Sequence, residues 1–69
     1  MEKTVQVPNI GCNGCVRTIQ YEVSQVPGVM SVKGDPSSKQ VTIVWDEAGG
    51  ATWEAIRAKL IEIDYPPAE

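Results

Sequence analysis

The stretch NIGCNGCVRTI, residues 9–19, decides the fold of this chain, because a strand pattern ends just before it and a helical pattern begins within it. It also contains the two cysteines of the chain, Cys12 and Cys15, each directly preceded by a glycine. Two cysteines at this spacing are typical of a redox dithiol, of half a zinc site, of a disulfide or of a metal site complete in itself. The rest of the sequence narrows these alternatives.

On the N-terminal side, residues 3–7 (KTVQV) alternate polar and apolar residues, which predicts a strand with Val5 and Val7 on one face. Pro8 has no N–H to donate to a sheet and therefore ends this strand. On the C-terminal side, Asn13 is a suitable N-cap for a helix. This helix is predicted from apolar residues at spacings of three, four and three: Val16, Ile19, Val23 and Val26.

Beyond this helix, which the Pro27-Gly28 pair is predicted to end, the sequence indicates a hairpin. Residues 29–34 and 40–45 are predicted strands, and the turn formers of residues 35–40 join them. The second of these strands is rich in β-branched residues and places Val41, Ile43 and Trp45 on one face.

A second helix is predicted to follow, with Thr52 as its N-cap. Its apolar stripe repeats the three-four-three spacing: Trp53, Ile56, Leu60 and Ile63. Pro66 and Pro67 prevent the helix from continuing, so the remaining tail is a short edge strand or coil.

The predicted element order is β-α-β-β-α with a short or absent final strand, which belongs to the α+β class. Two helices on one face of an antiparallel sheet form a two-layer sandwich of the ferredoxin-like type. A chain of 69 residues is expected to form a single domain, residues 1–69.

Composition excludes several function classes. The net charge is −3 with basic and acidic residues interspersed, which argues against a nucleic-acid partner. No apolar run is long enough to cross a membrane. No signal peptide opens the sequence, so we expect a cytoplasmic protein with reduced thiols. The initial methionine favours a free-standing protein over a segment of a longer one.

The two cysteines are predicted to lie at a helix start, Cys12 in the loop and Cys15 in the first turn. Unpaired N–H groups and the helix dipole favour thiolates there. Residues three apart on a helix have Cβ atoms about 5–6 Å apart, and a linear S–metal–S unit spans about 4.6 Å. The pair therefore fits a soft ion of low coordination number, such as Cu(I).

The other uses of the pair are weighed against this one. Zinc prefers four ligands, and the chain has neither histidine nor a third cysteine. A disulfide would close a very small loop and stabilise the fold little. A thiol–disulfide oxidoreductase stays open, since a C-x-x-C pair at a helix N-terminus can cycle between dithiol and disulfide. Arg17 is expected either to offset the charge of two thiolates or to be solvated.

The sequence VPNIGCNGCVRTIQYEVSQVPGVMSV resembles the heavy-metal-associated domain family, which occurs in small copper chaperones and at the N-termini of metal-pumping P-type ATPases. The family pattern is a strand, Gly-Met-x-Cys-x-x-Cys, a helix ending in Pro-Gly-Val, a hairpin, a second helix and Gly-Tyr. The matches are Cys12, Cys15, residues 27–29, the KQVTIVW strand and Tyr65. The resemblance covers nearly the whole chain and implies the β-α-β-β-α-β ferredoxin-like fold.

The chain departs from the family pattern around the cysteines. Ile10 stands where the family has a methionine that packs beneath the loop, and Gly11 stands where threonine or histidine is common. Asn9 and Asp64 each replace a glycine. The resemblance implies that Tyr65 approaches the metal loop and tunes its solvent access and thiolate charge. The residues predicted to surround the two cysteines are Ile10, Gly11, Asn13, Gly14, Arg17 and Tyr65.

The resemblance also implies a function, that of a metal carrier rather than an enzyme. Cys12 and Cys15 would hold one soft ion, Cu(I) in the first place, and pass it on by thiolate exchange. The expected partner is a metal-transporting P-type ATPase or another metal-binding domain, and a metal-bridged homodimer is a further arrangement. Zn(II), Cd(II) and Hg(II) stay open as alternative metals.

Overall fold

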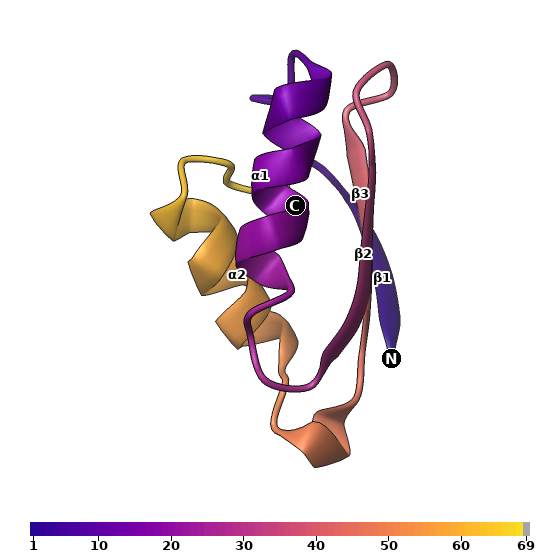
Figure 1. Cartoon of the computed structure of the whole chain (residues 1–69), viewed down its shortest axis with the longest axis vertical. Helices are drawn as coiled ribbons and strands as arrows, with labels where there is room; N and C mark the ends of the chain where they lie inside the picture. Colours follow the sequence, from indigo (N-terminus) through magenta and orange to yellow (C-terminus); the bar gives the residue numbers. More distant parts are fainter. Residues whose placement is uncertain (69) are drawn as a thin grey trace.

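The computed structural model describes residues 1–68. The elements are β1 (Glu2–Gln6), α1 (Asn13–Val23), β2 (Val29–Asp35), β3 (Gln40–Trp45), the 3-10 turn η1 (Glu47–Gly49) and α2 (Trp53–Glu62). The three strands form one antiparallel sheet in the order β1-β3-β2, and both helices cover the same face of it (Figure 1). The predicted two-layer α+β sandwich is therefore confirmed.

The hairpin of β2 and β3 forms where the sequence predicts it. Gly34 of β2 lies opposite Val41 of β3, and β1 pairs with the other edge of β3. The side chains of Val41, Ile43 and Trp45 are all buried, so the alternating face is the one beneath the helices. A Cβ at Gly34 would lie 2.8 Å from Cγ1 of Val16, which shows how closely α1 packs on β2.

The start of α1 differs from the prediction by one residue. Asn13 is not the N-cap, because it is already the first helical residue. Cys12 is the N-cap instead, with an extended backbone (φ −160°, ψ 169°) and no side-chain capping bond. The carbonyl of Cys12 accepts the N–H of Cys15 at 3.2 Å, so the helix begins between the two cysteines.

The end of α1 also lies earlier than predicted, at Val23. Pro27 disfavours the helical conformation for Val26, the residue before it. Turn hydrogen bonds take over: the N–H of Gln25 donates to the carbonyl of Glu22, and the N–H of Val26 to that of Val23. Val26, predicted as the last residue of the stripe, is therefore half-buried in the turn. The other three stripe residues are buried as predicted: Val16, Ile19 and Val23.

The second helix begins as predicted, because the side chain of Thr52 accepts the N–H of Ala55 at 3.2 Å. Ile56 and Leu60 of the predicted stripe are buried. Its two end members, Trp53 and Ile63, are half-buried against the same core.

The exit from α2 is a Schellman motif, in which the N–H of Asp64 donates to the carbonyl of Ile61 and the N–H of Tyr65 to that of Leu60. Asp64 occupies the left-handed position with φ 71°. The tail then returns to β1, where the N–H of Ala68 donates to the carbonyl of Gln6 at 2.7 Å. Within residues 1–68 this isolated bridge stands in place of a final strand, which agrees with the prediction of a short or absent last strand.

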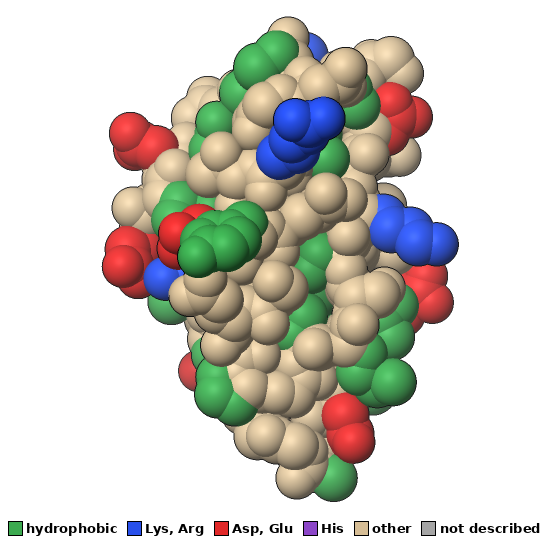
Figure 2. All heavy atoms as spheres, in the orientation of Figure 1, with side chains coloured by type: hydrophobic (Ala, Val, Ile, Leu, Met, Phe, Trp, Pro, Cys, Tyr) green, Lys and Arg blue, Asp and Glu red, His purple; other side chains and the backbone are tan. Residues whose placement is uncertain are grey.

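The core lies between the sheet and the two helices. Its buried side chains are Val5, Val7, Ile10, Val16, Ile19, Val23, Val41, Ile43, Trp45, Ala51, Ile56 and Leu60. At the end of the sheet away from the cysteines, the rings of Trp45 and Trp53 stack with centroids 6.3 Å apart, so the two tryptophans pack against each other. On the side of the molecule drawn in Figure 2, where the helices lie beside the edge of the sheet, basic and acidic side chains are dispersed and form no large patch of one sign.

Candidate metal centre

Cys12 and Cys15 lie at the start of α1 with their Sγ atoms 3.1 Å apart, and both thiols are free. Cys12 is exposed, whereas Cys15 is partly buried and packs against the core. The two sulfurs therefore lie side by side at the surface, one on the residue that precedes the helix and one on its first turn.

Ile10 anchors the cysteine loop from below. Its side chain is fully buried in the core, and its N–H donates to the carbonyl of Val7 at 3.1 Å. Isoleucine has few χ1 rotamers to choose from, so this anchor is stiff. The packing role expected at the family's methionine position is therefore retained by this residue.

Four other residues predicted to surround the cysteines are two glycines beside them in the sequence and two exposed polar residues of α1. A Cβ at Gly11 would meet nothing within 4 Å, and one at Gly14 would meet only the Sγ of Cys12, at 3.7 Å. Crowding does not require glycine at either position, and neither residue has a side chain that could cover the sulfurs. Asn13 and Arg17 are exposed on the first turns of α1. Within residues 1–68, no hydrogen bond or ion pair connects either side chain to a cysteine.

Tyr65 reaches the site from the far end of the chain. Its hydroxyl donates to Cys15, and this hydrogen bond is the main cause that lowers the pKa of the Cys15 thiol from 9.0 to about 7, followed by the backbone of Gly11 and the side chain of Cys12. The same bond, together with burial, raises the pKa of Tyr65. At neutral pH much of Cys15 is therefore thiolate, the form that binds metals, while Tyr65 stays protonated and donates.

Asn9 was not among the residues predicted to surround the cysteines, yet it connects the cysteine loop to the turn that precedes Tyr65. Its side-chain Nδ2 donates to the backbone carbonyl of Asp64 at 3.0 Å, which joins the cysteine loop to the turn after α2. Both residues replace glycines of the family pattern, and that coincidence is the signal that sequence could have offered. No periodicity connects them, because 55 positions separate them along the chain.

Two features are absent from residues 1–68. Across residues 1–68, no group of three or more His, Cys, Asp or Glu side chains is placed to hold a metal ion. None of the helices in that part of the chain is long and apolar enough to span a bilayer.

Comparison with known proteins identifies the family. Residues 4–66 match the family described as the heavy-metal-associated domain. The chain belongs to this family. The COP-associated protein of Helicobacter pylori (strain J99) is similar to it, with 34% identity over 62 residues that cover 90% of this chain and 91% of the relative.

Solved structures share the architecture of this heavy-metal-associated domain. The solution structure of apo-CopP from Helicobacter pylori matches with a TM-score of 0.86 and 32% identity, covering 99% of this chain and 100% of that one. A copper binding domain from HMA7, a P-type ATPase, matches with a TM-score of 0.88 over 97% and 89% of the two chains. Its 16% identity shows a common fold alone.

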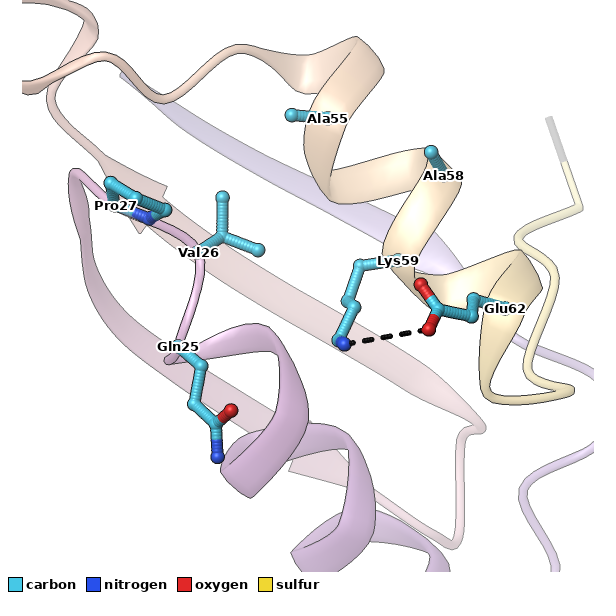
Figure 3. A pocket seen from close by; sticks show the side chains of 7 residues that line it. All are labelled: Gln25, Val26, Pro27, Ala55, Ala58, Lys59 and Glu62. Carbon is cyan, nitrogen blue, oxygen red and sulfur yellow. Dashed lines mark ion pairs between the residues drawn. The ribbon is translucent and has the colours of Figure 1, made fainter.

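A groove of about 470 Å³ lies between the turn after α1 and helix α2 (Figure 3). Its lining residues are Gln25, Val26, Pro27, Ala55, Ala58, Lys59 and Glu62. Lys59 Nζ lies 3.8 Å from Glu62 Oε1 and 3.3 Å from Glu22 Oε2, so it ties α2 to α1. The groove is at the opposite end of α1 from Cys12 and Cys15 and is separate from the candidate metal centre of this heavy-metal-associated domain.

Proposed function

We propose that this heavy-metal-associated domain carries one Cu(I) ion between Cys12 and Cys15. The observation that carries the proposal is the pair of free sulfurs 3.1 Å apart at an exposed helix start. The lowered pKa of Cys15, about 7, supports it, because thiolates are the ligands that Cu(I) selects. Membership of the heavy-metal-associated family supports a metal ion as the cargo.

Binding requires a small opening of the pair. A linear S–Cu–S unit spans about 4.6 Å, so the sulfurs, now 3.1 Å apart, must separate by about 1.5 Å. Cys12 is the residue free to move, since it is exposed and precedes the helix. Cys15 is fixed within α1 and holds the hydrogen bond from Tyr65.

This difference between Cys12 and Cys15 sets the proposed order in which their bonds to copper break. A thiolate of the acceptor attacks the ion from the exposed Cys12 side and forms a three-coordinate intermediate. The bond to Cys12 breaks first and the bond to Cys15 second, so the copper stays Cu(I) and is never free. The proposed acceptor is a P-type ATPase domain of this fold or another metal-binding domain with its own cysteine pair. Two copies of this chain sharing one ion would use the same chemistry.

The proposed role is carriage and not catalysis. The proposed location is the cytoplasm, because thiol pairs stay reduced there. A two-thiolate site at the surface suits fast transfer, since a fully coordinated ion would present no open position to an incoming thiolate.

The first test is an anaerobic Cu(I) titration of the reduced protein against a chromophoric chelator, with parallel Zn(II) and Hg(II) titrations. We expect one tightly bound Cu(I) per chain and much weaker Zn(II). Cys12→Ser and Cys15→Ser should each weaken Cu(I) binding by more than about 100-fold, beyond what loss of an outer partner costs. Tyr21→Phe, an exposed residue on the solvent side of α1, is the control. Unchanged Cu(I) binding in both serine variants, or Zn(II) bound as tightly as Cu(I), would contradict the proposal.

A further inference from the structure

Two segments from opposite ends of the chain meet beside the cysteines. Asn9 lies in the loop between β1 and α1, directly before the buried anchor Ile10. Asp64 lies in the turn after α2, directly before Tyr65. The hydrogen bond of 3.0 Å from Nδ2 of Asn9 to the carbonyl of Asp64 connects them. The residues on either side of this bond are therefore the loop anchor and the tyrosine that contacts Cys15.

The turn after α2 needs such a contact more than an ordinary helix end does. Asp64 holds the left-handed conformation (φ 71°), which costs a residue with a Cβ more than it costs glycine. Two backbone hydrogen bonds, from the N–H groups of Asp64 and Tyr65, close the motif from the α2 side. The carbonyl of Asp64 accepts the hydrogen bond from Asn9, which gives the turn a partner in the cysteine loop.

We propose that Asn9 is a positioning residue of the metal centre: its side-chain amide latches the Asp64–Tyr65 turn onto the cysteine loop and so holds the Tyr65 hydroxyl against Cys15. The expected effect of Asn9 on metal binding rests on the proposed function. The hydrogen bond from Asn9 to Asp64, called the latch below, is present in the metal-free protein and does not depend on that proposal.

Asparagine is suited to this role by its chemistry. The contact needs a donor, because a backbone carbonyl only accepts. An aspartate at residue 9 would keep the size of the side chain but place an acceptor against an acceptor. Both partners are exposed, so water competes for the bond. We therefore expect its loss to change the measured quantities by about 2–10-fold, the range of a single net hydrogen bond.

Hydrogen–deuterium exchange of the metal-free protein tests the latch directly. Asn9→Ala and Asn9→Asp should speed exchange at the amides of Asp64 and Tyr65 by about 2–10-fold. Gln25→Ala, which removes another exposed amide side chain at the far end of α1, should leave these two amides unchanged. Equal exchange in the wild type and in both Asn9 variants would overturn the inference.

A double-mutant cycle tests whether the latch acts through Tyr65. Asn9→Ala should weaken Cu(I) binding by about 2–10-fold in the wild type and by no further factor when Tyr65→Phe is already present. If Asn9 had only a structural role, Asn9→Ala would lower the free energy of unfolding equally in both backgrounds and would weaken Cu(I) binding equally in both. That result would overturn the inference. If the wild type binds no Cu(I), the proposed function fails and the exchange experiment alone decides the latch.

Discussion

At the scale of single residues, the site depends on one contact between distant parts of the chain. Tyr65 donates to Cys15 and keeps the pKa of that thiol near 7. The spacing of the cysteine pair identified a candidate site with several possible uses, and Tyr65 could be recognised because the chain resembles a known family. Asn9 could not be assigned a role from its neighbours, because its partner is the backbone carbonyl of Asp64, and a backbone carbonyl leaves no trace in a sequence.

The contact with Tyr65 predicts a pH dependence. The pKa of Cys15 is depressed, so its thiolate predominates above pH about 7 and is lost as the pH falls through that value. Tyr65→Phe removes the largest cause of the depression and should move the pKa up toward 9.0. The check is the pH profile of alkylation in a Cys12→Ser background, where only Cys15 reacts.

The Cys12→Ser background itself raises the midpoint somewhat, because the side chain of Cys12 also lowers this pKa. The comparison is therefore made within that background, with Tyr21→Phe as the matched loss of an exposed tyrosine hydroxyl. A midpoint that Tyr65→Phe leaves in place would show that the hydroxyl does not set the reactivity of Cys15.

At the scale of elements, most of the chain could be predicted from local pattern. The stripes of both helices and the alternation of β3 identify the buried faces, and Thr52 marks the start of α2. The ends of α1 could not be placed correctly, since Asn13 and Val26 satisfy the pattern equally well inside or outside a helix. The backbone at Cys12 and the proline after Val26 decide those two boundaries.

The exit of α2 predicts a stabilising substitution. Asp64→Gly should raise the free energy of unfolding by about 0.5–1 kcal/mol, because glycine adopts the left-handed position without the cost of a Cβ. Asp64→Ala removes the same carboxylate but keeps the Cβ, and it should give no gain. Urea unfolding followed by tryptophan fluorescence measures both. Equal stabilisation by the two substitutions would attribute the effect to the lost charge instead.

At the scale of the whole molecule, the fold brings three segments to one end. The cysteine loop, the start of α1 and the turn after α2 meet there, while the stacked tryptophans and the groove beside Pro27 lie elsewhere. The layer architecture follows from the order of strands and helices, so the sequence was sufficient to predict it. The precise approach of Tyr65 and Asp64 to the loop depends on how the packed helices are placed, which local sequence does not encode.

In the proposed complex, two thiolates of one chain hold one Cu(I). The measurement that tests it most directly is X-ray absorption at the copper edge of the loaded, reduced protein at a low chain concentration. We expect a two-coordinate Cu(I) with two sulfur neighbours, supplied by Cys12 and Cys15. Copper bound with nitrogen or oxygen neighbours and a single sulfur, or bound equally in a variant lacking both cysteines, would contradict it.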